Sequence, residues 1–114
     1  MAKASASSAA PPARVQAVIR QLGRDLATAR RRRRIPQKLL AERMLISPDT
    51  LQRLEKGDPK VGLHVLAGAL WAMGMLDRLA DIAAPTSDVV GATEELARLP
   101  KRARLPPEDP DLDF

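Results

Sequence analysis

Four polar side chains near the middle of the chain have the chemistry and the spacing needed to bind the edges of nucleic-acid bases. They are Asp49, Thr50, Gln52 and Arg53. If this segment is a helix with Leu51 and Leu54 on its buried face, helical periodicity places these four side chains on the outside. A helix that presents polar side chains from its first turns has the geometry needed to enter the major groove of DNA. The sequence therefore predicts a DNA-binding helix in this segment.

Local signals predict that this helix is short and follows another helix after a tight turn. Ser47 can cap it by accepting a backbone N–H bond, and Pro48 suits its first position. Asp49 complements the positive helix end, and Gly57 supplies a left-handed stop. The preceding helix has an apolar face formed by Leu40, Ala41 and Met44. Residues 37–57 thus predict a helix-turn-helix unit, with an ordinary helical hairpin as the alternative.

Composition and apolar periodicity predict an all-α fold. The chain has 114 residues, with one Trp, one Phe and no Tyr, which favours a helical core over a β-sandwich. It has no cysteine, which excludes a disulfide framework and fits a reducing cytoplasm. Apolar stripes mark a first helix (Val15, Ile19, Leu22, Leu26), a fourth (Leu63, Leu66, Leu70, Met73) and a short fifth (Leu76, Leu79, Ile82).

The chain is predicted to divide into four parts. They are a disordered N-terminal tail (1–13), a packed helical domain (14–84), a further helix (85–100) and an extended charged tail (101–114). Thr86 or Ser87 is predicted to cap the further helix, which Pro100 ends.

Charge is distributed unevenly. Residues 1–60 carry 14 Lys+Arg and 5 Asp+Glu, a net +9, whereas residues 61–114 carry 5 and 9, a net −4, and the two sum to +5. A basic half joined to an acidic half indicates one face for phosphate and another for a different partner. The densest basic block, Arg30–Arg34, is interpreted either as a solvated helix end or as a partly phosphate-facing surface.

Other classes of function find no support in the sequence. His64 is the only histidine and has no second ligand at metal-binding spacing, so no metal site is expected. The sequence has no Gly-rich phosphate loop, nucleophile elbow or His-containing triad, so neither a cofactor nor enzymatic activity is expected. No signal-peptide pattern and no run of ~20 apolar residues is present, so we expect a cytoplasmic chain without a membrane partner.

A wider pattern surrounds the predicted unit, from about Leu22 to Leu79. It consists of Leu22, Leu26, Arg30, Gln37, Leu40, Ala41, Ile46, Ser47 and Leu54-Glu55-Lys56-Gly57. This pattern resembles the Cro/repressor-type regulators of the XRE (xenobiotic-response-element) family. The resemblance implies a compact five-helix Cro/repressor-like helix-turn-helix domain. It also implies an ion pair between Arg30 and Glu55.

The resemblance and the positions of nearby residues give DNA-contact roles. The expected base-reading residues are Asp49, Thr50, Gln52 and Arg53. The expected phosphate contacts are Gln37, Lys38, Lys56 and Lys60, which position the reading helix on the DNA backbone. The chain departs from the family at the turn, where Leu45 replaces the usual glycine. Pro48 and Asp49 also replace amide or hydroxyl residues, so the target sequence cannot be taken from a relative.

The fourth and fifth helices carry more apolar positions than a domain of this size can easily bury, which indicates an interface. A symmetric homodimer fits, because two recognition helices about 34 Å apart read a palindromic operator. Trp71 is interpreted as part of the core or of this interface. Leu39, beside the outer face of its helix, either covers the fifth helix or belongs to a partner surface.

The C-terminal sequence narrows the resemblance. The segment Leu-Pro-Lys-Arg-Ala-Arg (99–104) and the final Asp-Leu-Asp-Phe (111–114) resemble HipB-like antitoxins, which are encoded beside HipA-type kinase toxins. This implies a transcriptional repressor that binds double-stranded DNA, autoregulates its operon and holds a HipA-like kinase, with Leu112 and Phe114 as anchors of the tail. The alternative is a stand-alone Cro/repressor-type regulator without a toxin partner. Either protein is expected at the nucleoid, in a bacterial cytoplasm.

Overall fold

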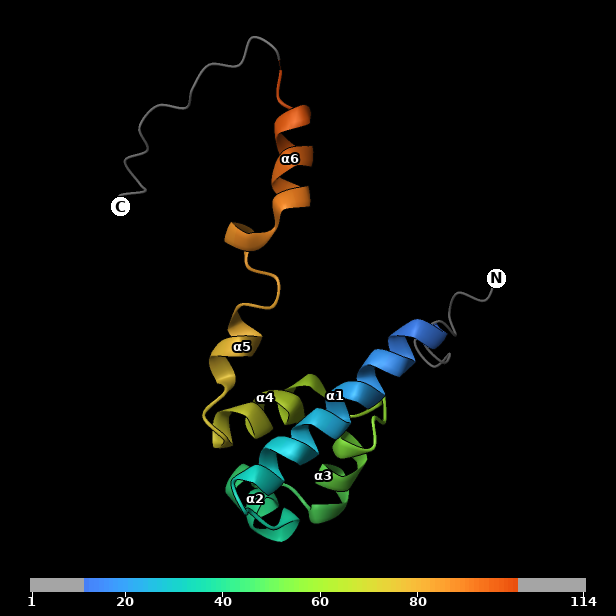
Figure 1. The fold of residues 1–114 in the computed structure, drawn as a ribbon, viewed down its shortest axis with the longest axis vertical. Coiled ribbons are helices and arrows are strands. Elements are labelled where there is room, and N and C mark those ends of the chain that lie inside the picture. The colour runs from blue at the N-terminus through green and yellow to red at the C-terminus, as the bar shows by residue number, and fades with distance from the viewer. Residues whose placement is uncertain (1–11, 101–114) are drawn as a thin grey trace. The chain divides into compact units, whose positions relative to one another are not determined.

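The computed structural model describes residues 12–100, and all regular structure in this range is helical. The elements are α1 (Ala13–Arg32), α2 (Gln37–Met44), α3 (Pro48–Glu55), α4 (Leu63–Ala72), α5 (Leu76–Ala80), the 3-10 turn η2 (Pro85–Ser87) and α6 (Val89–Ala97) (Figure 1). The chain divides into two units between Ala80 and Asp81, and each is described by itself. The all-helical prediction is confirmed for this range, and the predictions for residues 1–11 and 101–114 lie outside it.

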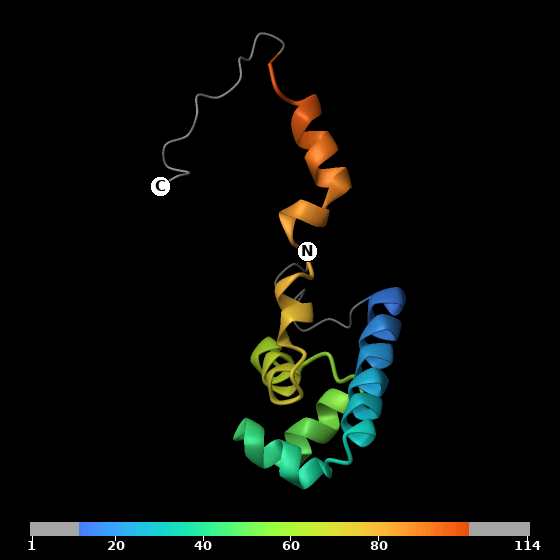
Figure 2. The same ribbon diagram turned by 60° about the vertical axis from the view of Figure 1, so that its left-hand side comes forward.

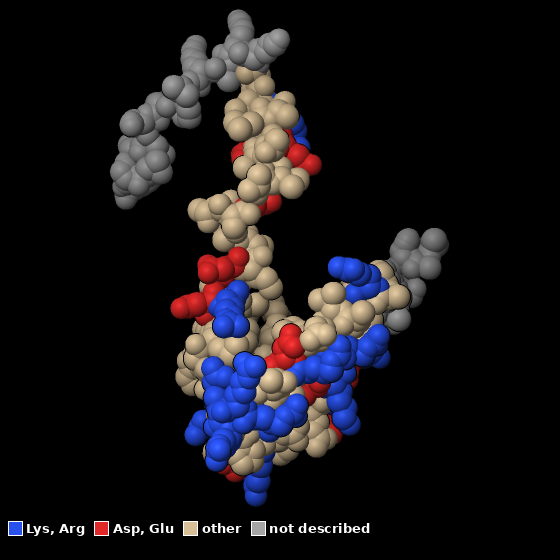
Figure 3. Space-filling view, in the orientation of Figure 1, with Lys and Arg blue, Asp and Glu red and all other residues tan. Residues whose placement is uncertain are grey.

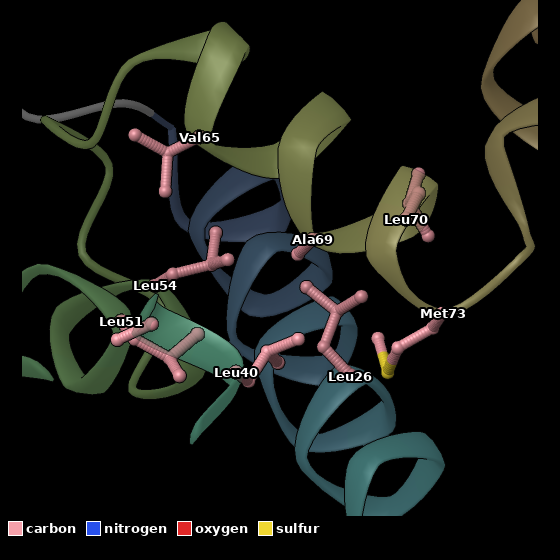
Figure 4. Close-up of a cluster of buried hydrophobic side chains, with 9 residues drawn as sticks. Leu26, Leu40, Leu51, Leu54, Val65, Ala69, Leu70 and Met73 are labelled. Atoms are coloured by element: carbon pink, nitrogen blue, oxygen red, sulfur yellow. The ribbon is translucent and has the colours of Figure 1, made fainter. Parts of the chain in front are cut away.

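The core of the first unit is formed by side chains from its first four helices. Leu40, Ala41 and Leu51 are almost completely buried, and Leu26 of α1 and Ala69 of α4 pack with them. Figure 4 shows the core side chains converging from these helices. α3 packs along α1, and α2 packs against both α3 and α4 (Figures 1 and 2). This shared core fixes the orientation of α2 relative to α3.

Helices α1 to α4 end in the same way, with one residue in the left-handed region. These residues are Arg34 (φ 55°), Leu45 (φ 59°), Gly57 (φ 81°) and Gly74 (φ 75°). In each case the following residue donates its N–H to a carbonyl in the last turn of the helix, at 2.7–3.2 Å. This arrangement is a Schellman motif, which satisfies the terminal carbonyls and reverses the chain within a few residues. The tight turns between the helices follow from it.

The predicted apolar stripe of α1 is buried only toward its C-terminal half. Leu26 is 3% exposed, whereas Val15 and Leu22 are 44% and 37% exposed. α1 has 20 residues and α3, which packs along it, has only 8. At 1.5 Å per residue the shorter helix cannot cover the longer one, so part of the α1 stripe stays in contact with solvent.

The buried face of α4 also differs from the predicted one. Val65, Ala69 and Met73 are buried at a spacing of four residues, and Leu70 is buried beside them. Leu63, predicted to face inward, is the first residue of the helix and is 69% exposed. Because α4 packs on α2 and α3 through the face that carries Val65 and Ala69, the stripe is rotated from its expected position.

In the second unit α6 begins later than predicted. Asp88 is its N-cap, with Oδ1 accepting the N–H of Gly91 at 3.0 Å. The prediction that Thr86 or Ser87 caps this helix was wrong. The Ser87 hydroxyl instead donates to the carbonyl of Ala84 at 3.2 Å, within the 3-10 turn that precedes α6.

Candidate nucleic-acid interface

The turn between α2 and α3 is built from local signals that the structure confirms. Leu45 adopts the left-handed conformation at a cost of about 1–2 kcal/mol, and its side chain is 91% exposed. Ile46 is partly buried against the core. The hydroxyl of Ser47 accepts the N–H of Thr50 at 3.2 Å, and Pro48 occupies the first position of α3. α3 therefore starts at a defined point and in a defined direction.

α3 presents a polar stripe to solvent. Its members recur at i, i+3, i+4 and i+7 and are Asp49, Gln52, Arg53 and Lys56, all of them exposed. Thr50, also predicted to read bases, is half-buried, and its hydroxyl lies 3.0 Å from that of Ser47. Three of the four predicted base-reading side chains thus lie on the polar stripe, and the hydroxyl of the fourth belongs to the helix cap.

The predicted ion pair between Arg30 and Glu55 is present and is formed by two hydrogen bonds. Nε of Arg30 donates to Oε2 of Glu55 at 2.7 Å, and Nη2 donates to Oε1 at 3.0 Å. The two side chains are only 9% and 7% exposed. Nη1 of Arg30 donates to the carbonyl of Ile35 at 3.0 Å. This pair, here called the clamp, joins the end of α1 to the last turn of α3.

The clamp depends on a close approach of α1 to α3 at Gly23. A Cβ atom there would lie 2.5 Å from the carbonyl oxygen of Glu55 and 2.8 Å from that of Leu54. Because no side chain fits, glycine lets the two helices meet and brings Arg30 within reach of Glu55. The role of Gly23 was not predicted, although an isolated glycine inside a helical pattern is a recognised signal of close packing.

A shallow hollow of about 350 Å³ lies beside the clamp. It is lined by Arg24, Ala27 and Arg31 of α1, Gln37 of α2, and Gln52, Glu55 and Lys56. Nε2 of Gln37 donates to Oε1 of Glu55 at 2.9 Å, and Oε1 of Gln37 accepts from Nε2 of Gln52 at 3.4 Å. Gln37 therefore connects the clamp to the polar stripe. Arg30 neutralises the charge of Glu55, so the hollow has a net positive charge from Arg24, Arg31 and Lys56. This charge suits an anion such as phosphate.

Two of the cations around the hollow come from α1 and broaden the predicted site. Arg24 was not predicted, and Arg31 belongs to the block whose interpretation the sequence left open. The two are seven residues apart and so lie on one face of the helix, which is the signal that could have linked them. Figure 3 shows many Lys and Arg side chains on the visible face of α1 and α2. Lys38 and Lys60 are exposed but do not line the hollow, and their phosphate contacts stay predictions.

Arg53 of the polar stripe forms an ion pair with Asp58, just beyond the end of α3. Nε of Arg53 donates to Oδ2 of Asp58 at 2.9 Å, and the two side chains are 46% and 29% exposed. The pKa of Asp58 is lowered, first by the backbone N–H of Lys60 and then by Arg53, so Asp58 is ionised at neutral pH. Sequence reasoning missed Asp58, because it lies five positions after Arg53 and regular helix spacing would not bring the two together.

The remaining site predictions concern other kinds of partner. Within residues 12–100 no group of three or more potential metal ligands comes together, and His64 is exposed. Among the helices of this part of the chain, none combines the length and the apolar character that a membrane span requires. Leu112 and Phe114, the predicted anchors for a protein partner, lie outside the described residues.

Comparison with protein-family models found no match, and neither curated proteins nor solved structures showed a significant similarity to this chain.

Proposed function

We propose that the chain is a sequence-specific DNA-binding protein of the Cro/repressor helix-turn-helix type and acts as a transcriptional repressor. The polar stripe of α3 carries this proposal. It is exposed, while Leu51 and Leu54 anchor the opposite side of the helix in the core and the clamp holds its last turn. A rigid helix with exposed donors and acceptors suits the major groove, which is ~12 Å wide.

In this proposal base reading and backbone binding fall to different parts of the site. Arg53 binds a guanine through O6 and N7, and Asp49 and Gln52 contact neighbouring base edges. The hollow beside the clamp receives a backbone phosphate at Gln37 and Lys56. Phosphate contacts of this kind set the orientation of the reading helix and carry no sequence information directly.

The proposal includes a homodimer on a palindromic operator. Trp71 was predicted to lie either in the core or at an interface. It is 63% exposed in the described unit, so it is not part of the core. Leu63 and Leu76, on α4 and α5, are 69% and 39% exposed. Exposed apolar side chains on neighbouring helices support an interface, and a symmetric dimer would match the symmetry of a palindrome.

Selection of binding sites from a random pool of double-stranded DNA tests the proposal. We expect the wild-type chain to enrich a palindrome whose half-sites are about one helical turn apart. Arg53→Ala should weaken binding to that sequence by about 1–3 kcal/mol and relax the preference at one base pair per half-site. Arg78→Ala, which removes an exposed arginine from α5, is the control and should leave the preference unchanged. Equal weakening of all sequences by Arg53→Ala would identify Arg53 as a phosphate contact instead.

The finer role, as autoregulating antitoxin of a HipA-like kinase, stays a prediction. It depends on the segment 99–114, most of which lies outside the described residues. The stand-alone regulator remains the alternative, and the neighbouring gene separates the two, since only the antitoxin requires an adjacent kinase. Either role would place the protein at the nucleoid of a bacterial cytoplasm.

A further inference from the structure

The residue that follows the left-handed residue at the end of α3 is charged, whereas the residues at the same position after α1, α2 and α4 are apolar. After α1, α2 and α4 this position holds Ile35, Ile46 and Met75, each partly buried against the core. An apolar contact at this position commonly accompanies a Schellman motif. After α3 the position holds Asp58, whose side chain reaches back to Arg53. After the other three helices this position makes an apolar contact with the core. After α3 it makes a polar contact with the helix itself.

Asp58 is held in place by several hydrogen bonds. Its N–H donates to the carbonyl of Arg53 at 3.0 Å, and its Oδ1 accepts the N–H of Lys60 at 2.9 Å. The preceding carbonyl, that of Gly57, accepts from Nε2 of Gln16 at 2.9 Å, which ties the turn to α1. Gly57 itself has φ 81° and packs tightly against α1. The carboxylate consequently has a fixed place relative to α3.

The geometry of the ion pair leaves Arg53 ready to bind an acceptor. The guanidinium is planar and carries five N–H donors, and Asp58 engages the one on Nε. The Nη donors are not used by this pair. A bidentate contact with guanine O6 and N7 needs two parallel donors of this kind. Arginine has a flexible side chain, and holding it in one orientation before binding reduces the entropy lost on contact.

We propose that Asp58 is a positioning residue that sets the base specificity of Arg53. The inference rests on the proposed function, because it requires Arg53 to read a base. By holding Nε, the carboxylate orients the guanidinium toward one acceptor pair. Its negative charge also opposes a shift of Arg53 toward phosphate and lowers affinity for DNA that lacks the matching base. Asp58 thereby lowers the affinity for DNA in general and increases the discrimination at the base pair that Arg53 reads.

The test is Asp58→Asn, which keeps the side-chain shape and an acceptor for the N–H of Lys60 but removes the charge. Binding is measured by fluorescence anisotropy on three duplexes: the selected operator, the operator changed at the base pair read by Arg53, and a scrambled sequence. We expect discrimination at that base pair to fall about five- to twentyfold, part of the full value of a bidentate contact. Affinity for the scrambled duplex should rise about two- to threefold, because one repulsive charge is removed.

Three controls separate positioning from general charge and folding effects. Asp77→Asn removes an exposed carboxylate from α5 and should leave discrimination unchanged. Asp58→Asn combined with Arg53→Ala should lose no more discrimination than Arg53→Ala alone, because the two act through one contact. If Asp58→Asn melts well below wild type, Asp58→Ser supplies another uncharged side chain with an acceptor for the turn.

The outcomes distinguish this inference from the proposed function. If the wild type selects no sequence, the proposed function and this inference both fail. If the wild type selects a sequence but Arg53→Ala leaves discrimination unchanged, the base-reading role of Arg53 and this inference fail, and other residues carry the sequence selection. If Arg53→Ala behaves as expected but folded Asp58 variants discriminate like wild type, only the inference fails. An equal loss from Asp58→Asn in the presence and absence of Arg53 would also overturn it, because Asp58 would then act independently of Arg53.

Discussion

Removing the Glu55 carboxylate tests whether the clamp holds α3 in place. Glu55→Ala deletes the acceptor of three hydrogen bonds, two from Arg30 and one from Gln37. The Arg30 side chain is 9% exposed and would keep its bond to the carbonyl of Ile35, but its charge would stay buried without an anion. Breaking a buried pair by removing one partner costs about 3–5 kcal/mol.

A loss of this size is large relative to the stability of a small helical unit. At about 0.05–0.15 kcal/mol per residue, a unit of about 70 residues has roughly 3.5–10 kcal/mol in total. Each kcal/mol shifts the Tm of such a unit by about 4–8 °C, so the expected decrease in Tm is about 12–40 °C. The less stable end of this range would leave the variant largely unfolded at moderate temperature.

Thermal melting followed by far-UV circular dichroism measures the effect. Glu42→Ala is the matched control, because it makes the same substitution at an exposed position of α2 and should melt close to wild type. Glu55→Gln keeps an acceptor for Arg30 but loses the charge, and should fall between wild type and Glu55→Ala. A Tm for Glu55→Ala within about 4 °C of wild type would refute the reasoning, because the loss would then be under ~1 kcal/mol.

Two further predictions concern phosphate binding and the turn before α3. Lys56→Ala should weaken binding to every DNA sequence and reduce the log–log salt slope by about one unit, and an unchanged slope would show that Lys56 does not neutralise a phosphate. Leu45→Gly should raise stability in urea unfolding by about 0.5–1 kcal/mol, because it relieves left-handed strain and loses little burial at a side chain that is 91% exposed. A decrease would show that the exposed leucine has a stabilising contact.

Features that depend on a few neighbouring residues could be predicted from the order of the amino acids. Ser47 caps α3, Pro48 opens it and Gly57 follows its end because each preference is set by the conformation and hydrogen bonds of one turn. Leu51 and Leu54 face inward because helical periodicity relates neighbouring positions. The two helices α2 and α3, and the polar stripe on α3, could therefore be predicted without any knowledge of how the chain packs.

Family resemblance added one contact that no local rule supplies. Arg30 and Glu55 are 25 positions apart, and neither periodicity nor capping relates them. Even so, the resemblance did not indicate that Gly23 permits this contact or that Arg24 and Arg31 share the hollow with Gln37. These groupings depend on how closely α1 and α3 approach.

Which apolar faces are covered, and which polar groups meet, depends on how the helices pack. The exposed positions of Leu63 and Trp71 follow from the orientation of α4 on its neighbours, and a helical wheel cannot supply that orientation. The contact between Asp58 and Arg53 arises because the chain reverses at Gly57 and brings back a residue that helical spacing would carry away. The sequence specifies local conformations well because their energies are local, whereas burial and long-range pairing depend on where whole helices meet.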